Sequence, residues 1–189
     1  MVSNQEALRI HSLMPFSRAN GPGRRSVLWV QGCTLGCPGC FNPHTHPPKE
    51  GESVPVNDLV DRLRALQGPI EGLTISGGEP LQQIRPLVQF LKQVRQKTTL
   101  SVVLFSGYRW EEIQRMPAHS QLLANLDVLI AGRYEAAQRL GRDLRGSANK
   151  SLHFLTGRYS EQDFTALPEA EISIGVDGEV LLSGIDPIR

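Results

Sequence analysis

The three cysteines of the chain, Cys33, Cys37 and Cys40, lie within one stretch of eight residues. Thiolates at these spacings can converge on one soft-metal centre, and iron–sulfur clusters and zinc are the usual occupants. A structural zinc site needs a fourth ligand, which His44 or His46 could supply. A four-iron cluster on three thiolates would instead leave one iron open to a substrate or cofactor. The odd number of cysteines argues against a disulfide framework and for a reducing compartment.

The composition is that of one compact soluble domain. With 189 residues, 40% of them hydrophobic, and a net charge of +1, the chain can bury a sizeable core. This charge gives no reason to expect nucleic acid or anionic lipid as a partner. No stretch approaches the ~20 apolar residues that cross a bilayer, so we expect a cytoplasmic protein without membrane contacts. No repeat or long linker divides residues 1–189, which predicts a single domain.

Short apolar runs alternate with helical patterns along the chain. Nearly continuous apolar runs predict parallel strands covered on both faces, at residues 26–31, 73–76, 101–106 and 126–131. Apolar residues on one face predict helices at residues 56–66 and 84–94. Further helices are predicted within residues 108–124, with an interruption near Pro117, and within residues 134–144.

Repeated strand–helix units predict an α/β fold with a mainly parallel sheet, whose functional loops lie at the carboxyl ends of the strands. The cysteine loop follows the first of these strands, and Gly77, Gly78 and Glu79 follow the second. Tyr108 follows the third strand and Arg133 the fourth. The four strand ends are therefore expected to converge on one cavity.

Two segments outside this pattern have less regular sequences. Residues 44–55 are rich in proline and predict an irregular loop between the cysteines and the first helix. The tail predicts a small hairpin, with strands at residues 171–176 and 179–182. Three arginines at near-helical spacing could form a basic docking face, although such arginines ordinarily belong to a solvated surface. They are Arg139, Arg142 and Arg145.

A three-cysteine cluster after one strand and Gly77, Gly78 and Glu79 after the next resemble the pattern of the radical S-adenosylmethionine enzymes. The resemblance implies that the cysteines hold a 4Fe-4S cluster whose open iron takes the amino and carboxylate groups of S-adenosylmethionine. It implies that Gly77, Gly78 and Glu79, followed by Pro80, bind the methionyl ammonium. The reduced cluster would cleave the cofactor to a 5′-deoxyadenosyl radical, which removes a hydrogen atom from a substrate.

A closer resemblance extends over residues 18–153, the core of the predicted domain. Its blocks look like those of the activating enzymes of anaerobic ribonucleotide reductase, and they are residues 20–23, Arg25, residues 31–33, 37–42, 76–80, 105–108, 127–134 and 145–150. Such activases generate a glycyl radical on a partner enzyme. The resemblance implies a partial (βα)-barrel, open on one side to admit a protein loop, with residues 154–189 as a C-terminal extension.

The resemblance also implies roles for residues beside the two motifs. Phe41 follows the third cysteine, as in these activases, and Ser106 and Tyr108 lie where the adenosyl group would be bound. The fourth strand of such activases usually ends Asp-Gly-Lys, whereas this chain has Ala131 and Arg133 at the outer positions. Arg133 would bind the methionyl carboxylate, since a guanidinium can do so through two hydrogen bonds.

Three classes of function remain open. The first is an enzyme acting on a glycyl-radical protein, with a one-electron donor such as flavodoxin or ferredoxin. The second is a radical enzyme that modifies a peptide or small metabolite, and the third is a metal-bearing binding module without catalysis. So short a chain has little extra structure for a closed pocket, which favours a protein substrate.

One further position departs from the activases that this chain resembles. Lys150 replaces a glutamine that is usual in them.

Overall fold

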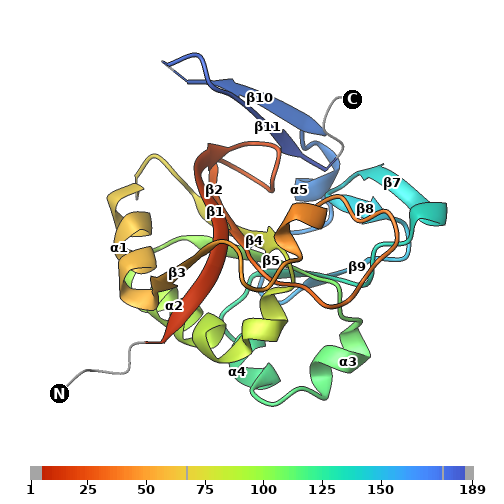
Figure 1. Cartoon of the computed structure of the whole chain (residues 1–189), viewed down its shortest axis with the longest axis horizontal. Helices are drawn as coiled ribbons and strands as arrows, with labels where there is room; N and C mark the ends of the chain where they lie inside the picture. The colour runs from red at the N-terminus through yellow and green to blue at the C-terminus, as the bar shows by residue number, and fades with distance from the viewer. Residues whose placement is uncertain (1–5, 67, 176, 186–189) are drawn as a thin grey trace.

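The computed structural model describes residues 6–66, 68–175 and 177–185. Its centre is a seven-stranded sheet in the order β3-β1-β2-β4-β5-β6-β9 (Figure 1). The outer strands β3 and β9 do not pair with each other, so the sheet stays open. The expected α/β fold, a partial barrel with a mainly parallel centre, is confirmed.

Four adjacent strands run parallel at the centre of the sheet. They are β2 (Arg25–Val30), β4 (Gly72–Gly77), β5 (Ser101–Ser106) and β6 (Val128–Ala131). Most of their side chains are buried on both faces, which explains their nearly continuous apolar sequences. These four strands match the predicted runs within a few residues.

Three further strands of the sheet were not predicted. They are β1 (Ala7–Ser17), β3 (Glu52–Pro55) and β9 (Ser151–Phe154), and each is antiparallel to its neighbours. In β1 the register with β2 shifts twice, so the side chains do not keep a strict alternation along the strand. The prediction of an irregular loop over residues 44–55 was therefore wrong for its last four residues, which form β3.

The first two long helices pack against the sheet at the places predicted. They are α1 (Val56–Leu66) and α2 (Ile84–Lys97), the latter preceded by the short helix η2 (Pro80–Gln83). Leu59 and Leu63 of α1 join Leu87 and Leu91 of α2 in the main apolar core with the strands. α3 (Trp110–Gln114) and α4 (His119–Leu123) are separated at Pro117, as expected. None of the helices in the described ranges is long and apolar enough to cross a membrane.

The helix predicted within residues 134–144 was wrong. The chain forms a short helix η3 (Ala136–Gln138) and then a hairpin of β7 (Arg139–Arg142) and β8 (Arg145–Ser147). Asp143 and Leu144 have φ angles of 55° and 57°, as a two-residue hairpin turn requires, and a continuous helix excludes such angles. The three arginines at near-helical spacing, Arg139, Arg142 and Arg145, therefore lie on a hairpin and not on a helix.

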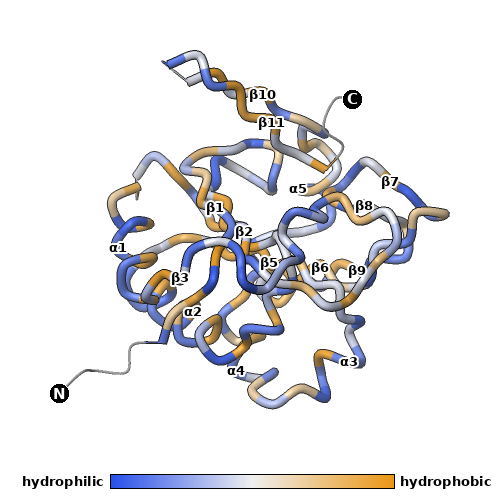
Figure 2. The backbone as a smooth tube through the Cα atoms, in the orientation of Figure 1, coloured by the Kyte–Doolittle hydropathy of each residue, from blue (hydrophilic) through white to orange (hydrophobic). Residues whose placement is uncertain are grey.

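The tail forms the predicted hairpin, from β10 (Ala170–Ile174) to β11 (Val180–Gly184), after the short helix α5 (Gln162–Thr165). The predicted end of its first strand, Val176, lies outside the described residues. Glu171 anchors the hairpin, because its Oε2 accepts hydrogen bonds of 2.8 Å from Ser17 Oγ and Arg18 N. Figure 2 shows apolar residues along the hairpin, and several are exposed, including Ile174 and Leu182.

Candidate active site at the carboxyl ends of the strands

The cysteine loop leaves the end of β2 and is held by backbone hydrogen bonds to the segment that follows it. The amide of Gly32 donates to Thr45 O over 2.8 Å, and the amide of Cys33 donates to His46 O over 3.1 Å. Within the loop the amide of Cys40 donates to Cys37 O, closing a turn. All three cysteines are free and half-buried, so their thiols are available as ligands.

The sulfur atoms share one loop but are not gathered into a finished metal site. No three His, Cys, Asp or Glu side chains in the described ranges are close enough together to hold a metal ion. His44 was one of the two predicted fourth ligands for zinc. Its ring lies against that of His11, with centroids 5.0 Å apart. The pKa of the Cys33 thiol is raised, mainly by burial and further by Glu79, Cys40 and Cys37. Ligation would draw the loop together, because metal binding supplies folding free energy at such sites.

The backbone at the end of β4 is hydrogen-bonded to the backbone at the start of the cysteine loop. The amide of Gly78 donates to Val30 O over 2.8 Å, and the amide of Glu79 donates to Gly32 O over 2.9 Å. Gly77 has a φ of 104°, and a Cβ on Gly78 would collide with the backbone of Gly32. These two positions thus require glycine, and their hydrogen bonds fix the two motifs side by side.

The Glu79 side chain is buried, with 1% exposure, and three groups donate to its carboxylate. Oε1 accepts from Leu81 N and Ser106 Oγ, both over 2.9 Å, and Oε2 accepts from Gly107 N over 2.7 Å. Burial raises the pKa of Glu79 to about 6, while these hydrogen bonds and the charge of Lys150 oppose the rise. Glu79 therefore ties the end of β4 to the end of β5, and Pro80 begins η2 directly after it.

The two residues predicted beside the adenosyl group lie at the end of β5. Ser106 is buried and also accepts a hydrogen bond of 3.0 Å from Tyr108 N, so its hydroxyl is part of the Glu79 network. Tyr108 is half-buried, and its hydroxyl lies 3.3 Å from Gln82 Nε2. Gln82 also donates to Thr34 Oγ1 over 2.8 Å, which links Tyr108 to the cysteine loop. Sequence reasoning missed Gln82, because no motif marked it.

Phe41 packs on the side of the site formed by the β7–β8 region. Its ring lies against that of Tyr134, with centroids 4.5 Å apart and planes tilted by 50°. A Cβ on Gly146 would meet the same ring at 2.5 Å, so this glycine makes room for Phe41. The guanidinium of Arg139 lies 5.4 Å from the ring centre. The position predicted for cofactor contact is thus an aromatic wall beside the third cysteine.

Arg133 follows β6, where its guanidinium is already engaged by protein groups. Its Nη1 donates to Glu112 Oε2 and, over 3.3 Å, to Gly107 O. The pKa of Arg133 is raised, chiefly by the hydrogen bond to Glu112, and the pKa of Glu112 is correspondingly lowered. The guanidinium also lies 5.4 Å from the centre of the Tyr108 ring. Glu112 gave no signal in the sequence, because its role depends on the fold of the loop after β6.

Lys150 brings a second cation to the same place. It precedes β9, whose Ser151 pairs with Ala131 at the end of β6, and its Nζ donates to Gly132 O over 2.6 Å. Burial lowers the pKa of Lys150, while the negative charges of Cys37, Glu79 and Cys40 raise it. The amine is therefore close enough to both motifs to interact with their charges.

Comparison with known proteins fits this arrangement. The family described as a 4Fe-4S single cluster domain matches residues 19–153. The anaerobic ribonucleoside-triphosphate reductase-activating protein of Enterobacteria phage T4 is 33% identical over 146 residues, which cover 74% of this chain and 90% of the relative. The chain belongs to the radical S-adenosylmethionine family of activating enzymes.

Further members of this family extend the comparison. The anaerobic ribonucleoside-triphosphate reductase-activating protein of Escherichia coli K12 is 29% identical over 159 residues, covering 78% of this chain and 99% of the relative. The pyruvate formate-lyase-activating enzyme of Clostridium pasteurianum is 30% identical over 119 residues, which cover 61% of this chain and 50% of the relative. The protein is therefore an enzyme of the glycyl-radical-activating type.

Proposed function

We propose that this activating enzyme binds a 4Fe-4S cluster through Cys33, Cys37 and Cys40 and uses S-adenosylmethionine to generate a radical on a protein partner. The observation that carries the proposal is the hydrogen bond from Glu79 N to Gly32 O, which joins the cofactor motif to the cysteine loop. The donor set supports it as well, because three free thiols on one loop suit iron–sulfur ligation and leave one iron without a protein ligand.

The protein's own residues supply positions rather than an acid or a base. When bound, the cluster and S-adenosylmethionine provide the one-electron reduction and the 5′-deoxyadenosyl radical. Gly77 and Gly78 allow the backbone after β4 to approach the cofactor, and Tyr108 and Phe41 flank the place where it would lie. Buried Glu79 keeps the ends of β4 and β5 together, which protects the geometry of the site.

We assign the substrate to the class of glycyl-radical proteins, and an anaerobic ribonucleotide reductase is the first candidate. The T4 and Escherichia coli relatives bear the name of that reductase, and this chain spans nearly their whole lengths. The open sheet leaves a side through which a loop of a partner protein could approach. A peptide or small metabolite remains the alternative substrate. Free thiols acting as ligands also suit a cytoplasmic enzyme served by a flavodoxin or ferredoxin.

Electron paramagnetic resonance tests this proposal. The reconstituted enzyme is mixed anaerobically with a reductant, S-adenosylmethionine and candidate glycyl-radical proteins from the same genome. A glycyl doublet that appears with one candidate, and not with the Cys37→Ala enzyme, is the expected result. Cofactor cleavage without a doublet on any candidate would favour the alternative substrate class.

A further inference from the structure

The carboxylate of the methionyl group needs a cation beside the cysteine loop. An anion placed near thiolates is repelled by them unless a positive charge offsets that repulsion. The charge of Cys37 acts on the side chains of Arg133 and Lys150. The question is which of the two is free to bind a carboxylate.

Arg133 already has a carboxylate partner. Its Nη1 bonds to Glu112 Oε2, and the side chains of this ion pair are 30% and 39% exposed. The cofactor carboxylate would be a second anion on a guanidinium whose charge Glu112 already offsets. The sequence-based assignment of the methionyl carboxylate to Arg133 therefore competes with an existing ion pair.

Lys150 has no such partner in the described part of the chain. Its ammonium has three donors, and the bond to Gly132 O uses one of them. That acceptor is a neutral carbonyl, so the positive charge is not offset by an ion pair. A protonated amine held this way can donate to an incoming carboxylate without giving up its present bond.

The segment around Lys150 contains buried polar atoms without hydrogen-bond partners. Within the described ranges, two buried side-chain polar atoms lack a hydrogen-bond partner, and both belong to this segment: Arg145 Nε and Asn149 Oδ1. Lys150 also borders a hollow of about 210 Å³ that Arg145 and Phe164 help to line. The segment that carries Lys150 thus borders a hollow and contains buried polar atoms without partners.

We infer that the ammonium of Lys150, and not the guanidinium of Arg133, binds the methionyl carboxylate of S-adenosylmethionine. This inference rests on the proposed function, because it names a further binding residue of the same site. Lys150 acts on affinity for the cofactor and on its orientation, while the cysteines alone hold the iron. The pairing couples one ligand group to one side chain, so removing either group should remove the same contribution.

A binding cycle with two ligands tests the pairing without turnover. Equilibrium dialysis measures S-adenosylmethionine and its decarboxylated analogue on the reconstituted, unreduced enzyme, for the wild type, Lys150→Gln, Lys150→Arg and Arg133→Gln. Lys92→Gln is the matched control, since its amine contacts Gln121 on the surface. Iron content and the visible spectrum are measured first, and Lys150→Met replaces the glutamine variant if that protein does not load iron.

The expected result is selective for the carboxylate. Lys150→Gln should bind S-adenosylmethionine about 10- to 100-fold more weakly, the range for a lost charged hydrogen bond, and bind the decarboxylated analogue within about threefold of the wild type. Lys150→Arg should recover most of the affinity. A carboxylate-selective loss in Arg133→Gln, or unchanged affinity in Lys150→Gln, would overturn the inference. A wild type that loads iron but binds no S-adenosylmethionine would instead overturn the proposed function.

Discussion

Arg25 at the amino ends of the parallel strands and Lys150 at their carboxyl ends differ in how many hydrogen bonds they make to the protein. At the amino ends Arg25 is fully buried and donates to several neutral groups, among them Thr74 Oγ1, Pro22 O, Ser101 Oγ, Leu73 O and Ser101 O. At the carboxyl ends the Lys150 amine donates to the carbonyl of Gly132, and the three cysteine thiols are not joined in a disulfide. The many bonds of the Arg25 guanidinium hold the fold together, whereas the Lys150 ammonium keeps donors that remain available to a ligand.

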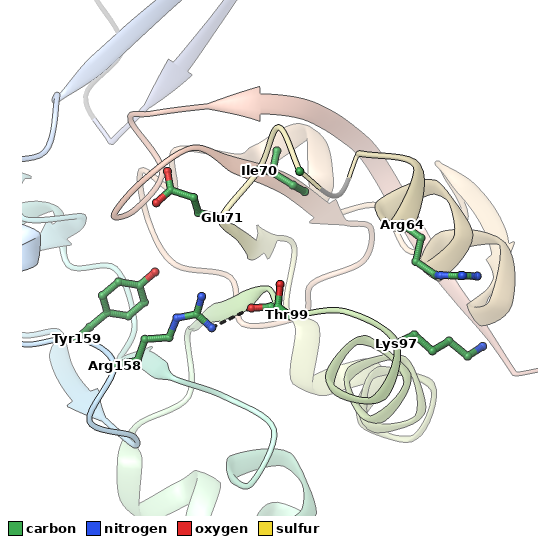
Figure 3. A pocket seen from close by; sticks show the side chains of 8 residues that line it. Arg64, Ile70, Glu71, Lys97, Thr99, Arg158 and Tyr159 are labelled. Carbon is green, nitrogen blue, oxygen red and sulfur yellow. Dashed lines mark hydrogen bonds between the residues drawn. The ribbon is translucent and has the colours of Figure 1, made fainter.

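The hollow at the amino ends shows that size alone does not identify a site. It has a volume of about 890 Å³, and Arg64, Lys97, Arg158 and Tyr159 help to line it. Figure 3 shows Arg158 directed at Thr99, whose carbonyl accepts its hydrogen bond of 3.0 Å, with Arg64 and Lys97 across the hollow from Tyr159. It contains no cysteine and lies at the opposite ends of the strands from the two motifs.

The largest expected effect is the loss of the cluster at the carboxyl ends. Cys37→Ala should reduce iron after reconstitution from about four per chain to near zero, because two thiolates cannot retain the cluster. The unfolding free energy of the metal-free protein should change by less than about 1 kcal/mol, since the Cys37 thiol is half-buried and forms no disulfide. Iron analysis and urea unfolding measure the two quantities. Full iron loading of the variant would remove Cys37 from the ligand set.

Arg25→Met, at the amino ends, should lower the unfolding free energy and leave iron loading unchanged. Removing the guanidinium takes one donor from each of the buried carbonyls of Leu73 and Ser101, so the unfolding free energy should fall by about 3–5 kcal/mol. Urea unfolding of the metal-free protein measures this loss. Arg64→Met, at an exposed arginine, is the matched control and should change stability by less than about 0.5 kcal/mol. Equal effects of the two substitutions would contradict a structural role for Arg25.

Glu79→Ala should weaken both stability and cofactor binding, because this residue is buried within the site. Its loss leaves the amides of Leu81 and Gly107 unsatisfied, which should lower the unfolding free energy by about 2–3 kcal/mol. Iron loading should be retained, while S-adenosylmethionine binding should weaken in equilibrium dialysis. Glu111→Ala, at an exposed glutamate, is the control. A variant as stable as the wild type would show that the network around Glu79 contributes little.

Glu79 should also give the stability a specific pH dependence. Its pKa is about 6 in the folded protein against an ordinary 4.5, so the folded state binds the proton more tightly. As the pH rises from 4.5 to 6, this group should therefore remove up to about 2 kcal/mol of unfolding free energy, with no further change above that window. Urea unfolding at several pH values measures it as the difference between wild type and Glu79→Ala. A difference that does not vary with pH would contradict the raised pKa.

The smallest effect is expected at the hollow of the amino ends. Lys97→Gln should leave stability within about 0.5 kcal/mol of the wild type, because Lys97 is exposed and its amine donates to Gln93 on the surface of the same helix. Binding of S-adenosylmethionine should stay within about twofold. A large loss of cofactor binding would mean that the two ends of the strands are coupled.

The central strands and the two motifs could be predicted because their signals are local. Buried parallel strands are apolar throughout, and the cysteine and glycine spacings report on single loops. Strand β1 was missed because its register shifts disturb the alternation, and the β7–β8 hairpin because its turn uses Asp143 and Leu144 rather than glycine. The partners of Glu79 and Arg133 come from distant segments, so only the folded chain reveals them.

A radical site at the carboxyl ends of the strands is tested most directly by cofactor cleavage in the reconstituted enzyme. With a strong reductant and S-adenosylmethionine, the wild type should release 5′-deoxyadenosine and methionine, quantified by chromatography, while Cys37→Ala should release neither. Lys97→Gln should match the wild type. Iron-loaded wild type that releases no 5′-deoxyadenosine, or a Cys37→Ala enzyme that releases as much as the wild type, would contradict a radical site at the carboxyl ends of the strands.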